Sequence, residues 1–263
     1  MGAPLHFDKY EGLGNDFILV EAADAAGLSV ERVVRLCDRR FGVGADGVLL
    51  VLPAHEGPCA ARMSVVNADG SVPEMCGNGL RCVATHLAAK RAHPAGPLRI
   101  ETDAGERDCA VGDDGEVTVD MGIVRALGER AVDVDGKPIV LALGDAGNPH
   151  AVLFGTFARG DVERLGPRIA THAAFPRGTN VEFARVEGDG IDLVVWERGV
   201  GVTMACGTGA CAAVAVAVAG GLLPAGRAVT VQLPGGRLEV RIAVDGRATM
   251  RGPARHVFSG IIE

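Results

Sequence analysis

Short runs of β-branched and other apolar residues, broken by turn residues, make up much of the chain and predict a structure rich in strands. After the run at residues 63–67, Ala68-Asp69-Gly70-Ser71 predicts a turn. In the second half, Pro234-Gly235-Gly236 predicts the turn of a hairpin. Only one main helix is expected in each half. The predicted strands are residues 63–67, 98–102, 107–111, 116–121 and 191–196.

Two segments predict those helices. Residues 80–91 repeat apolar residues at helical spacing. Residues 212–219 have the sequence AAVAVAVA, in which alternating valine favours a strand and alanine favours a helix. This segment aligns with the first predicted helix, and the Gly220-Gly221 pair that follows suits a helix C-cap, so a helix is predicted over residues 207–219. Because a helix that is apolar on every side must be buried all round, each lobe is expected to be a curved, mostly antiparallel sheet wrapped around a central helix.

The two predicted helices begin in nearly the same setting. The sequence MCGNGLRC at residues 75–82 matches ACGTGAC at residues 205–211, and the first cysteines lie 206 − 76 = 130 residues apart in a chain of 263. A second match, GNDF at residues 14–17 with GNPH at residues 147–150, places the two asparagines 148 − 15 = 133 residues apart. Matches at one register predict a duplicated domain.

The duplication predicts an α+β fold of two pseudo-symmetric lobes. The period of about 120 to 130 residues is long enough for each copy to fold around its own core. We expect lobes at residues 1–122 and 123–252, with the C-terminal segment 253–263 returning to the first lobe. Ligand sites are common between domains, so the site is expected between the two lobes.

Composition excludes several classes of protein. The net charge of −7 and the lack of a basic run give a nucleic-acid role little support. Hydrophobic residues are 48% of the chain, which is far from the composition of disordered chains. No basic segment followed by an apolar stretch begins the sequence, and the apolar run at residues 210–219 is too short to span a bilayer. A cytoplasmic protein without a membrane segment is therefore expected.

The seven cysteines are an odd number and do not have the spacing of a disulfide scaffold. Their local spacings, C-x5-C and C-x4-C, lack the C-x2-C pairs of structural zinc sites, so no metal is expected. Most of them are predicted to be small buried hydrophobic residues. These are Cys37, Cys59, Cys82, Cys109 and Cys211.

The other two cysteines, Cys76 and Cys206, each precede a Gly-rich helix start. Unsatisfied backbone N–H groups and the positive end of the helix dipole favour a thiolate there, and are expected to lower the thiol pKa from about 8.5. The same N–H groups can bind a substrate carboxylate, and the glycines let the backbone come close to a ligand. Either motif alone is equally consistent with a turn around a buried cysteine, but its recurrence in register favours catalysis.

Two matched thiols suggest proton transfer on both faces of a carbon. Inversion of a stereocentre requires a base on one face and an acid on the other, with one cysteine as thiolate and the other as thiol. Neighbouring thiolates raise each other's pKa, so the pair is expected to share one proton and to titrate as a coupled unit. His150 and Glu197 fall at matching points of the second half and are polar neighbours able to tune that unit.

Several spaced motifs follow one another along the chain. They are GLGNDF at 12–17, NADGS through MCGNG at 67–79, GNPH at 147–150, TNVEF at 179–183 and ERG through ACGTG at 197–209. In this order, and with the closing segment HVFSG at residues 256–260, they resemble the diaminopimelate epimerase family. The resemblance implies a cofactor-independent epimerase that interconverts LL- and meso-2,6-diaminopimelate in lysine and peptidoglycan-precursor synthesis. It also implies a homodimer.

The same resemblance assigns roles to residues. The catalytic pair falls on Cys76, the proton donor in the LL to meso direction, and Cys206, the acceptor, while His150 and Glu197 match positions that adjust cysteine pKa values. A planar arginine fork suits a carboxylate, asparagines both donate and accept, and a glutamate can receive an ammonium. The implied substrate contacts are Asn15, Asn67, Gly77, Asn78, Asn148, Asn180, Glu197, Arg198, Gly207 and Thr208.

Three positions depart from the family pattern. Gly47 stands where many members have a glutamine that contacts substrate, so it is left out of the predicted site. Trp196 replaces a usual tyrosine, and Phe258 stands where a tyrosine linked to dimer contacts is common. No pyridoxal phosphate is implied, because none of the three lysines, Lys9, Lys90 and Lys137, lies in a phosphate-binding context.

Two alternatives stay open. A proline-racemase-like enzyme also uses two cysteines, but such sequences tend to carry histidine where this chain has Asn78. A redox-responsive protein could instead join Cys76 and Cys206 in a regulated disulfide. The first differs in substrate and the second in class, so an assay of Cα proton exchange separates all three.

Overall fold

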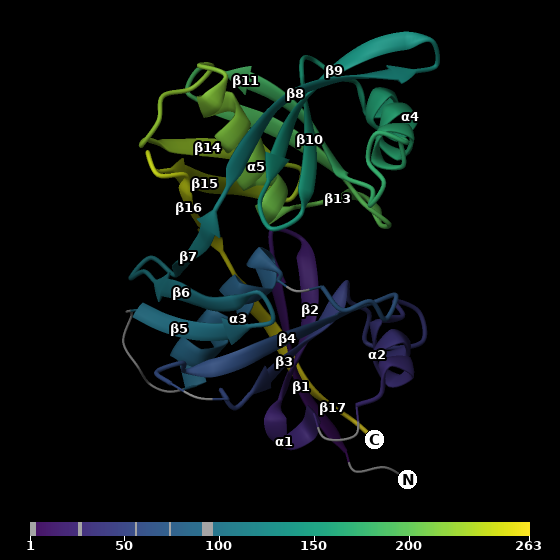
Figure 1. Cartoon of the computed structure of the whole chain (residues 1–263). Helices are drawn as coiled ribbons and strands as arrows, with labels where there is room; N and C mark the ends of the chain where they lie inside the picture. Colours follow the sequence, from purple (N-terminus) through teal and green to yellow (C-terminus); the bar gives the residue numbers. More distant parts are fainter. Residues whose placement is uncertain (1–3, 26–27, 56, 74, 91–96) are drawn as a thin grey trace. The chain divides into compact units, whose positions relative to one another are not determined.

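The computed structural model describes residues 4–25, 28–55, 57–73, 75–90 and 97–263. The chain divides into two compact units (Figure 1). Unit 1 comprises Met1–Val119 and Gly252–Glu263, and unit 2 comprises Asp120–Arg251. The C-terminal segment thus belongs to the unit in which the chain begins.

Unit 1 is built on a mixed sheet whose described strands follow the order β17-β1-β2-β3-β4-β5-β6-β7. The β2–β3 and β4–β5 pairs are parallel, and the other five pairs are antiparallel. The strands are β1 (Leu5–Gly12), β2 (Asn15–Glu21), β3 (Gly47–Leu52), β4 (Ala61–Asn67), β5 (Pro97–Thr102), β6 (Gly105–Val111), β7 (Glu116–Ile123) and β17 (Arg255–Ile262).

Unit 2 repeats this plan with the order β8-β9-β10-β11-β12-β14-β15-β16, and β13 pairs with β12 beside β14. Again the third and fifth pairs, β10–β11 and β12–β14, are parallel and the rest antiparallel. The strands are β8 (Arg125–Val134), β9 (Lys137–Asp145), β10 (Pro149–Phe154), β11 (Asn180–Glu187), β12 (Gly190–Glu197), β13 (Gly201–Thr203), β14 (Ala228–Leu233), β15 (Gly236–Ile242) and β16 (Arg247–Pro253).

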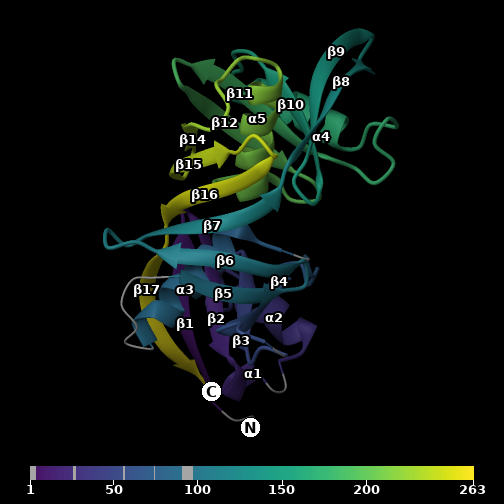
Figure 2. The ribbon, with the colours of Figure 1, turned by 60° about the vertical axis from the view of Figure 1, so that its left-hand side comes forward.

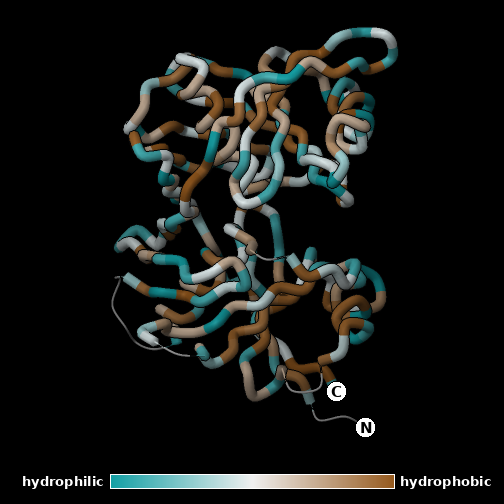
Figure 3. The backbone as a smooth tube through the Cα atoms, in the orientation of Figure 1, coloured by the Kyte–Doolittle hydropathy of each residue, from teal (hydrophilic) through white to brown (hydrophobic). Residues whose placement is uncertain are grey.

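The identical succession of parallel and antiparallel pairs confirms the predicted pseudo-symmetric α+β fold. In each unit one long helix packs against most strands of the sheet, α3 (Gly77–Lys90) in unit 1 and α5 (Gly207–Ala219) in unit 2 (Figure 2). Hydrophobic segments of the chain run through the interior of both units (Figure 3). Each sheet therefore wraps around a central helix, as the sequence predicts.

Helix α5 has the bounds that the sequence predicts, and residues 210–217 are all buried. Its small side chains let the sheet come close, since a Cβ at Gly144 of β9 would lie 3.1 Å from the Cβ of Ala212. Gly221 takes a left-handed backbone (φ 73°) that ends the helix, and the Leu222 N–H donates to the Ala217 carbonyl at 2.8 Å. This is the Schellman arrangement that favours glycine.

Other predicted elements are confirmed with small shifts of their ends. Helix α3 begins three residues before the predicted start at residue 80, and residue 91 of that prediction lies outside the described residues. Four of the five cysteines predicted to be buried are so, and Cys59 is half-buried. None of the described helices is long and apolar enough to cross a membrane.

The expectation of one main helix per half is wrong, because each parallel pair needs a crossover connection. Helices α1 (Ala22–Ala25) and α2 (Val30–Cys37) connect β2 to β3, and α4 (Arg159–Ala170) connects β10 to β11. Helix α4 contains Gly166 and Pro167, which normally end helices. A Cβ at Gly166 would lie 2.7 Å from the ring of Trp196, so close packing on β12 requires glycine there.

Candidate functional site

The predicted site residues fall into two groups, one in each unit, around the start of the central helix. Each group contains one cysteine, at least one glycine of the helix start and asparagines from neighbouring strands. Unit 1 holds Asn15, Asn67, Cys76, Gly77 and Asn78, and unit 2 holds Asn148, His150, Asn180, Glu197, Arg198, Cys206, Gly207 and Thr208.

In unit 1, the thiol of Cys76 lies directly before α3 and accepts a hydrogen bond from the Gly79 backbone N–H at 3.3 Å. The side chain is half-buried. A Cβ at Gly79 would lie 3.5 Å from the Cys76 Sγ and 2.8 Å from the Leu49 Cδ2, so a side chain there would have to displace Leu49 of β3. The helix start therefore holds the thiol at its N–H groups, as the spacing predicts.

Asn15 and Asn78 are joined in one directional chain of hydrogen bonds. The Asn15 Nδ2 donates to the Asp46 Oδ2 at 2.7 Å, and the Asn78 Nδ2 donates to the Asn15 Oδ1 at 3.0 Å. Asp46 also pairs with Arg39 at 2.8 Å. A carboxylate only accepts, so Asp46 fixes which way both amides point. Sequence reasoning missed Asp46, although it lies within the GVGADG motif that holds Gly47.

A cluster of charged side chains supports the hydrogen bonds of Asn15 and Asp46. The buried ammonium of Lys9 donates to Asp16 and to the Gly44 carbonyl, and Arg39 pairs with Asp16 at 2.6 Å. Burial raises the pKa of Asp16, but the hydrogen bonds and charges of Arg39 and Lys9 outweigh it and hold that pKa below its ordinary value. The ionised cluster fixes the backbone that carries Asn15 and Asp46.

Asn67 ends β4, opposite Gly47 in the sheet register. Its Nδ2 donates to the Ser71 Oγ at 2.9 Å and its backbone N–H to the Ser71 carbonyl at 2.8 Å, so it closes the predicted turn. A Cβ at Gly47 would lie 2.8 Å from the Val66 carbonyl oxygen. The local backbone thus favours the glycine that departs from the family pattern.

In unit 2, Cys206 is the N-cap of α5 and its Sγ accepts from the Gly209 N–H at 3.4 Å. The Thr208 Oγ1 lies 3.5 Å from the same sulfur. Cys206 is only 7% exposed, in contrast to the half-buried Cys76. The two thiols share a position at the helix start but differ in their access to solvent.

The expectation that the helix start lowers the thiol pKa is wrong for Cys206. Burial, followed by the carboxyl groups of Glu197 and Glu182, raises the pKa of Cys206 well above its ordinary value. Hydrogen bonds from Thr208 and from the Gly209 N–H act in the opposite direction and are weaker. Desolvation of a thiolate between two acidic side chains outweighs one or two N–H dipoles.

Glu197 shares this buried environment. Its Oε1 accepts from the Thr203 Oγ1 of β13 at 2.7 Å. Burial raises the pKa of Glu197, while hydrogen bonds with Thr203 and with Cys206 lower it to a smaller extent. The carboxyl group of Glu197 therefore interacts directly with the Cys206 thiol.

Asn180 and Arg198 are positioned together. The Asn180 Oδ1 accepts from the Arg198 backbone N–H at 2.9 Å, and its Nδ2 donates to the Pro149 carbonyl at 3.3 Å. The Arg198 Nη1 donates to the Arg177 carbonyl at 2.7 Å. Asn180 therefore ties together the start of β10 and the end of β12, and the guanidinium keeps further donors for a ligand.

His150 is completely buried between two partners. Its Nε2 lies 2.7 Å from the Asn148 Oδ1, and its Nδ1 lies 2.7 Å from the Glu182 Oε1. Sequence reasoning missed Glu182. The alternation of side chains along a strand was the available signal, because Glu182 follows Asn180 by two residues in a strand and must face the same side of the sheet.

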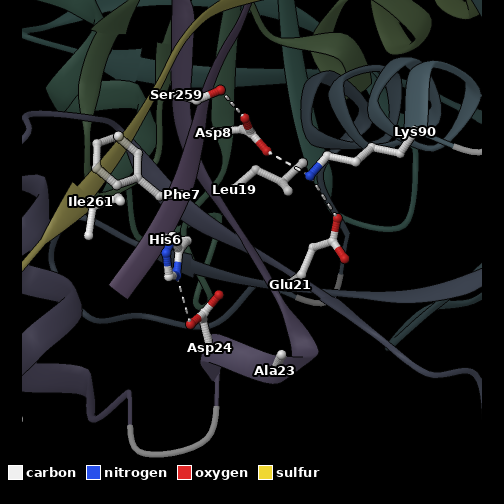
Figure 4. A pocket seen from close by; sticks show the side chains of 11 residues that line it. His6, Phe7, Asp8, Leu19, Glu21, Ala23, Asp24, Lys90, Ser259 and Ile261 are labelled. Atoms are coloured by element: carbon white, nitrogen blue, oxygen red, sulfur yellow. Dashed lines mark hydrogen bonds and ion pairs between the residues drawn. The ribbon is translucent and has the colours of Figure 1, made fainter. Parts of the chain in front are cut away.

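One surface cavity of unit 1 lies away from the predicted site residues. A cavity of about 530 Å³ in unit 1 is lined by residues of β1, β2, α1, α3 and β17, and none of the predicted site residues lines it (Figure 4). Asp8 there pairs with Lys90, and Lys90 with Glu21. In the part of the chain that the structure describes, no group of three or more His, Cys, Asp or Glu side chains is placed to hold a metal ion.

Comparison with known proteins shows one family throughout the chain. The family model described as diaminopimelate epimerase matches residues 7–127 and 143–257. A diaminopimelate epimerase from Cyanothece sp. is 44% identical over 98% of this chain and 99% of its own length. One from Desulfitobacterium hafniense is 42% identical over 97% of this chain and 96% of its own length.

Solved structures with similar folds are more distant in sequence. A probable proline racemase from Agrobacterium radiobacter has a TM-score of 0.78 at 17% identity, covering 98% of this chain and 93% of its own. A hydroxyproline epimerase from Agrobacterium vitis, with bound trans-4-hydroxy-L-proline, has a TM-score of 0.75 at 18% identity, covering 98% and 92%. At these identities the likeness establishes the fold.

Proposed function

The chain belongs to the diaminopimelate epimerase family and is an amino-acid epimerase of lysine biosynthesis, and we propose that it interconverts LL- and meso-2,6-diaminopimelate through a cysteine pair. The observation that carries the proposal is the matched position of Cys76 and Cys206, each bound by an N–H group of the first turn of its unit's central helix. The same product supplies peptidoglycan precursors, and no cofactor takes part.

The reaction needs one thiolate and one thiol. In the LL to meso direction the Cys206 thiolate takes the Cα proton, so the Cα–H bond breaks and its electron pair stays on carbon. The Cys76 thiol then gives its proton to the opposite face, and a new Cα–H bond forms. The enzyme ends with Cys206 as thiol and Cys76 as thiolate, and the reverse reaction restores the first state.

The raised pKa of Cys206 suits a base for a weakly acidic carbon. A thiolate whose thiol has a high pKa is a stronger base than one whose thiol has a low pKa, so it reduces the unfavourable free energy of proton transfer from Cα. Ionisation must then be favoured by the bound substrate. In this proposal the N–H groups of Gly207 and Thr208 bind the substrate carboxylate, and the substrate ammonium offsets the negative charge of Glu197.

The remaining residues recognise a zwitterion with two charged ends. Arg198 pairs with a carboxylate through its planar guanidinium, and Glu197 receives an ammonium. Asn15 and Asn78 carry amides oriented by Asp46. The further contacts are Asn67, Gly77, Asn148 and Asn180, and His150 with Glu197 adjusts the cysteine pKa values.

The test is solvent deuterium incorporation at Cα, followed by NMR when reduced enzyme meets LL-diaminopimelate. Exchange with epimerisation in the parent enzyme, lost in both Cys76→Ala and Cys206→Ala, is the expected result. Exchange with proline and none with diaminopimelate would replace the substrate and keep the chemistry. No exchange with any amino acid, together with a disulfide between the two cysteines, would favour a redox-responsive protein.

A homodimer is part of the proposal. Strand β17 pairs only with β1 among the described residues, and it exposes Val257, Phe258 and Ile261. An edge strand with exposed apolar side chains is a surface that proteins normally cover. A second copy of the chain is the occupant that the family resemblance implies.

A further inference from the structure

Glu182 is an acidic side chain in the interior of unit 2. It lies on β11, is 0% exposed, and belongs to none of the groups that the family resemblance assigns to catalysis or substrate binding. Its Oε1 approaches the His150 Nδ1 at 2.7 Å. Its Oε2 is buried without a hydrogen-bond partner of normal geometry among the described residues. A buried carboxyl group with one unsatisfied oxygen needs a physical explanation.

The hydrogen bonds of His150 fix the number of protons it shares with Glu182. The Asn148 Oδ1 can only accept, so the His150 Nε2 at 2.7 Å must carry a hydrogen. One further proton lies between Nδ1 and the Glu182 Oε1. It belongs either to the imidazole, giving an imidazolium and a carboxylate, or to Glu182, giving a neutral imidazole and a carboxylic acid.

The surroundings favour the second arrangement. A buried carboxylate is stable only where both oxygens receive donors, and the Glu182 Oε2 receives none of normal geometry. The nearest helix start does not supply them, because the Gly209 N–H donates to the Cys206 sulfur. Burial raises the pKa of Glu182, and the opposing effects of His150 and of two backbone N–H groups do not reverse this direction.

We propose that Glu182 is a positioning residue that stays protonated and donates its proton to the His150 Nδ1, which keeps the imidazole neutral with its hydrogen on Nε2. The proposal deepens the role proposed for Cys206 and rests on it. Glu182 lies against the thiol's own helix turn, since a Cβ at Gly209 would lie 2.9 Å from the Glu182 Oε1 and 3.3 Å from the Cys206 Sγ.

A neutral pair removes two charges from beside the thiol. With Glu182 neutral, the raised pKa of Cys206 rests on burial and on Glu197, whereas an imidazolium at His150 would lower that pKa and weaken the thiolate as a base. The titratable groups that face Glu182 are His150 from β10, Glu197 from β12 and Cys206 before α5. Helix α5 has no charged side chain of its own. Glu197 then remains as the acidic side chain whose ionisation depends on that of the Cys206 thiol.

The test compares Glu182→Gln with Glu182→Leu. Glutamine keeps the shape of a protonated glutamate and can donate its amide hydrogen to the His150 Nδ1, whereas leucine cannot. Glu187→Gln is the matched control, because Glu187 lies on the same strand with an exposed side chain. The readout is the ¹⁵N spectrum of histidine-labelled full-length enzyme without substrate, with a His150→Gln sample to assign the signals.

We expect a neutral His150 with its hydrogen on Nε2 at pH 7 in the parent, in Glu182→Gln and in the control. In Glu182→Leu this tautomer loses its partner, and the His150 signals should change. With diaminopimelate, Glu182→Gln should keep kcat within about threefold of the parent, while Glu182→Leu should lose about tenfold or more in kcat at a similar KM.

An imidazolium at His150 in the parent at pH 7 would overturn the proposal, and so would a Glu182→Gln variant as impaired as Glu182→Leu. If Glu182→Leu does not fold, the parent and glutamine spectra still decide the protonation state. These spectra need no substrate. A wrong substrate assignment would therefore leave them unchanged and would appear only as absent turnover in the parent enzyme.

Discussion

The Asn15 Nδ2 lies 2.7 Å from the Asp46 Oδ2, and this one contact sets the direction of both amides in unit 1. If Asp46 becomes alanine, Asn15 loses its acceptor and its amide is free to turn over. Since the asparagines are proposed to bind a zwitterion, we expect Asp46→Ala to lower kcat/KM for diaminopimelate by about tenfold or more, with a stability cost of about 1 kcal/mol.

Steady-state kinetics and urea unfolding measure the two effects. Asp113→Ala is the control, because Asp113 is exposed in the turn before β7 and belongs to no predicted site group. Activity within twofold of the parent in Asp46→Ala would show that Asn15 and Asn78 do not need this orientation.

The repeat allowed much of the fold to be predicted because it constrains distant parts of the chain at once. The alternation in residues 212–219 is ambiguous by itself, and alignment with the first helix decided it correctly. Helix α4 was missed because Gly166 and Pro167 break helical patterns locally, whereas its packing on Trp196 is a long-range contact. Sequence alone does not reveal that contact.

The proposed site contains residues that a motif and its chemistry indicate, and it omits partners that are distant in sequence. Cys206 and Glu197 were proposed from their motifs. Glu182 and Asp46 were not, since each acts through one residue 31 or 32 positions away. The direction of the Cys206 pKa was wrong for the same reason, because burial by the sheet depends on the complete fold.

The raised pKa of Cys206 predicts how the thiol reacts in the free enzyme. A thiol titrating well above its ordinary value is almost entirely protonated at neutral pH, so its thiolate fraction grows about tenfold per pH unit. We expect the rate of Cys206 alkylation by iodoacetamide, followed by peptide mass spectrometry, to rise with that slope from pH 7 to 9. A plateau below pH 8 would contradict the burial effect.

Stability should reveal the protonated state of Glu182. Its pKa is raised in the folded protein, so its contribution to stability is fully present below the unfolded pKa of about 4.3 and is lost as pH rises toward the folded value. Glutamine does not titrate. The free energy of unfolding of Glu182→Gln relative to the parent should therefore increase by about 1.4 kcal/mol per pH unit above pH 5.

Urea unfolding at several pH values measures this difference. The increase should stop once the folded protein also releases the Glu182 proton. A difference that does not change with pH between 5 and 8 would contradict the protonated state, because a Glu182 with an ordinary or lowered pKa is ionised in both the folded and the unfolded chain throughout this range.

Phe258 tests the proposed dimer. It is 45% exposed on the edge strand β17 and packs edge-to-face on Phe7 at 5.9 Å between ring centroids. Phe258→Glu should place a negative charge among the exposed apolar side chains of β17 and convert a dimer to a monomer, as measured by light scattering after gel filtration. Val244→Glu is the control, because Val244 is 95% exposed and belongs to unit 2, whereas β17 belongs to unit 1. A parent enzyme that is monomeric at 100 μM or so would end the dimer proposal.

Gly209 is the closest approach between the helix start, the thiol and Glu182. A Cβ there would lie 2.9 Å from the Glu182 Oε1 and 3.3 Å from the Cys206 Sγ, so Gly209→Ala must displace one of them.

At Gly160, near the start of α4, an added Cβ would meet no atom within 4 Å, so Gly160→Ala is the control. Alanine favours helices over glycine, so Gly160→Ala should be neutral or stabilising by about 1 kcal/mol or less. Gly209→Ala should instead lose about tenfold or more in kcat, because the first turn of α5 holds the proton acceptor. Equal activity of the two variants would show that the position of the Cys206 sulfur does not depend on this turn.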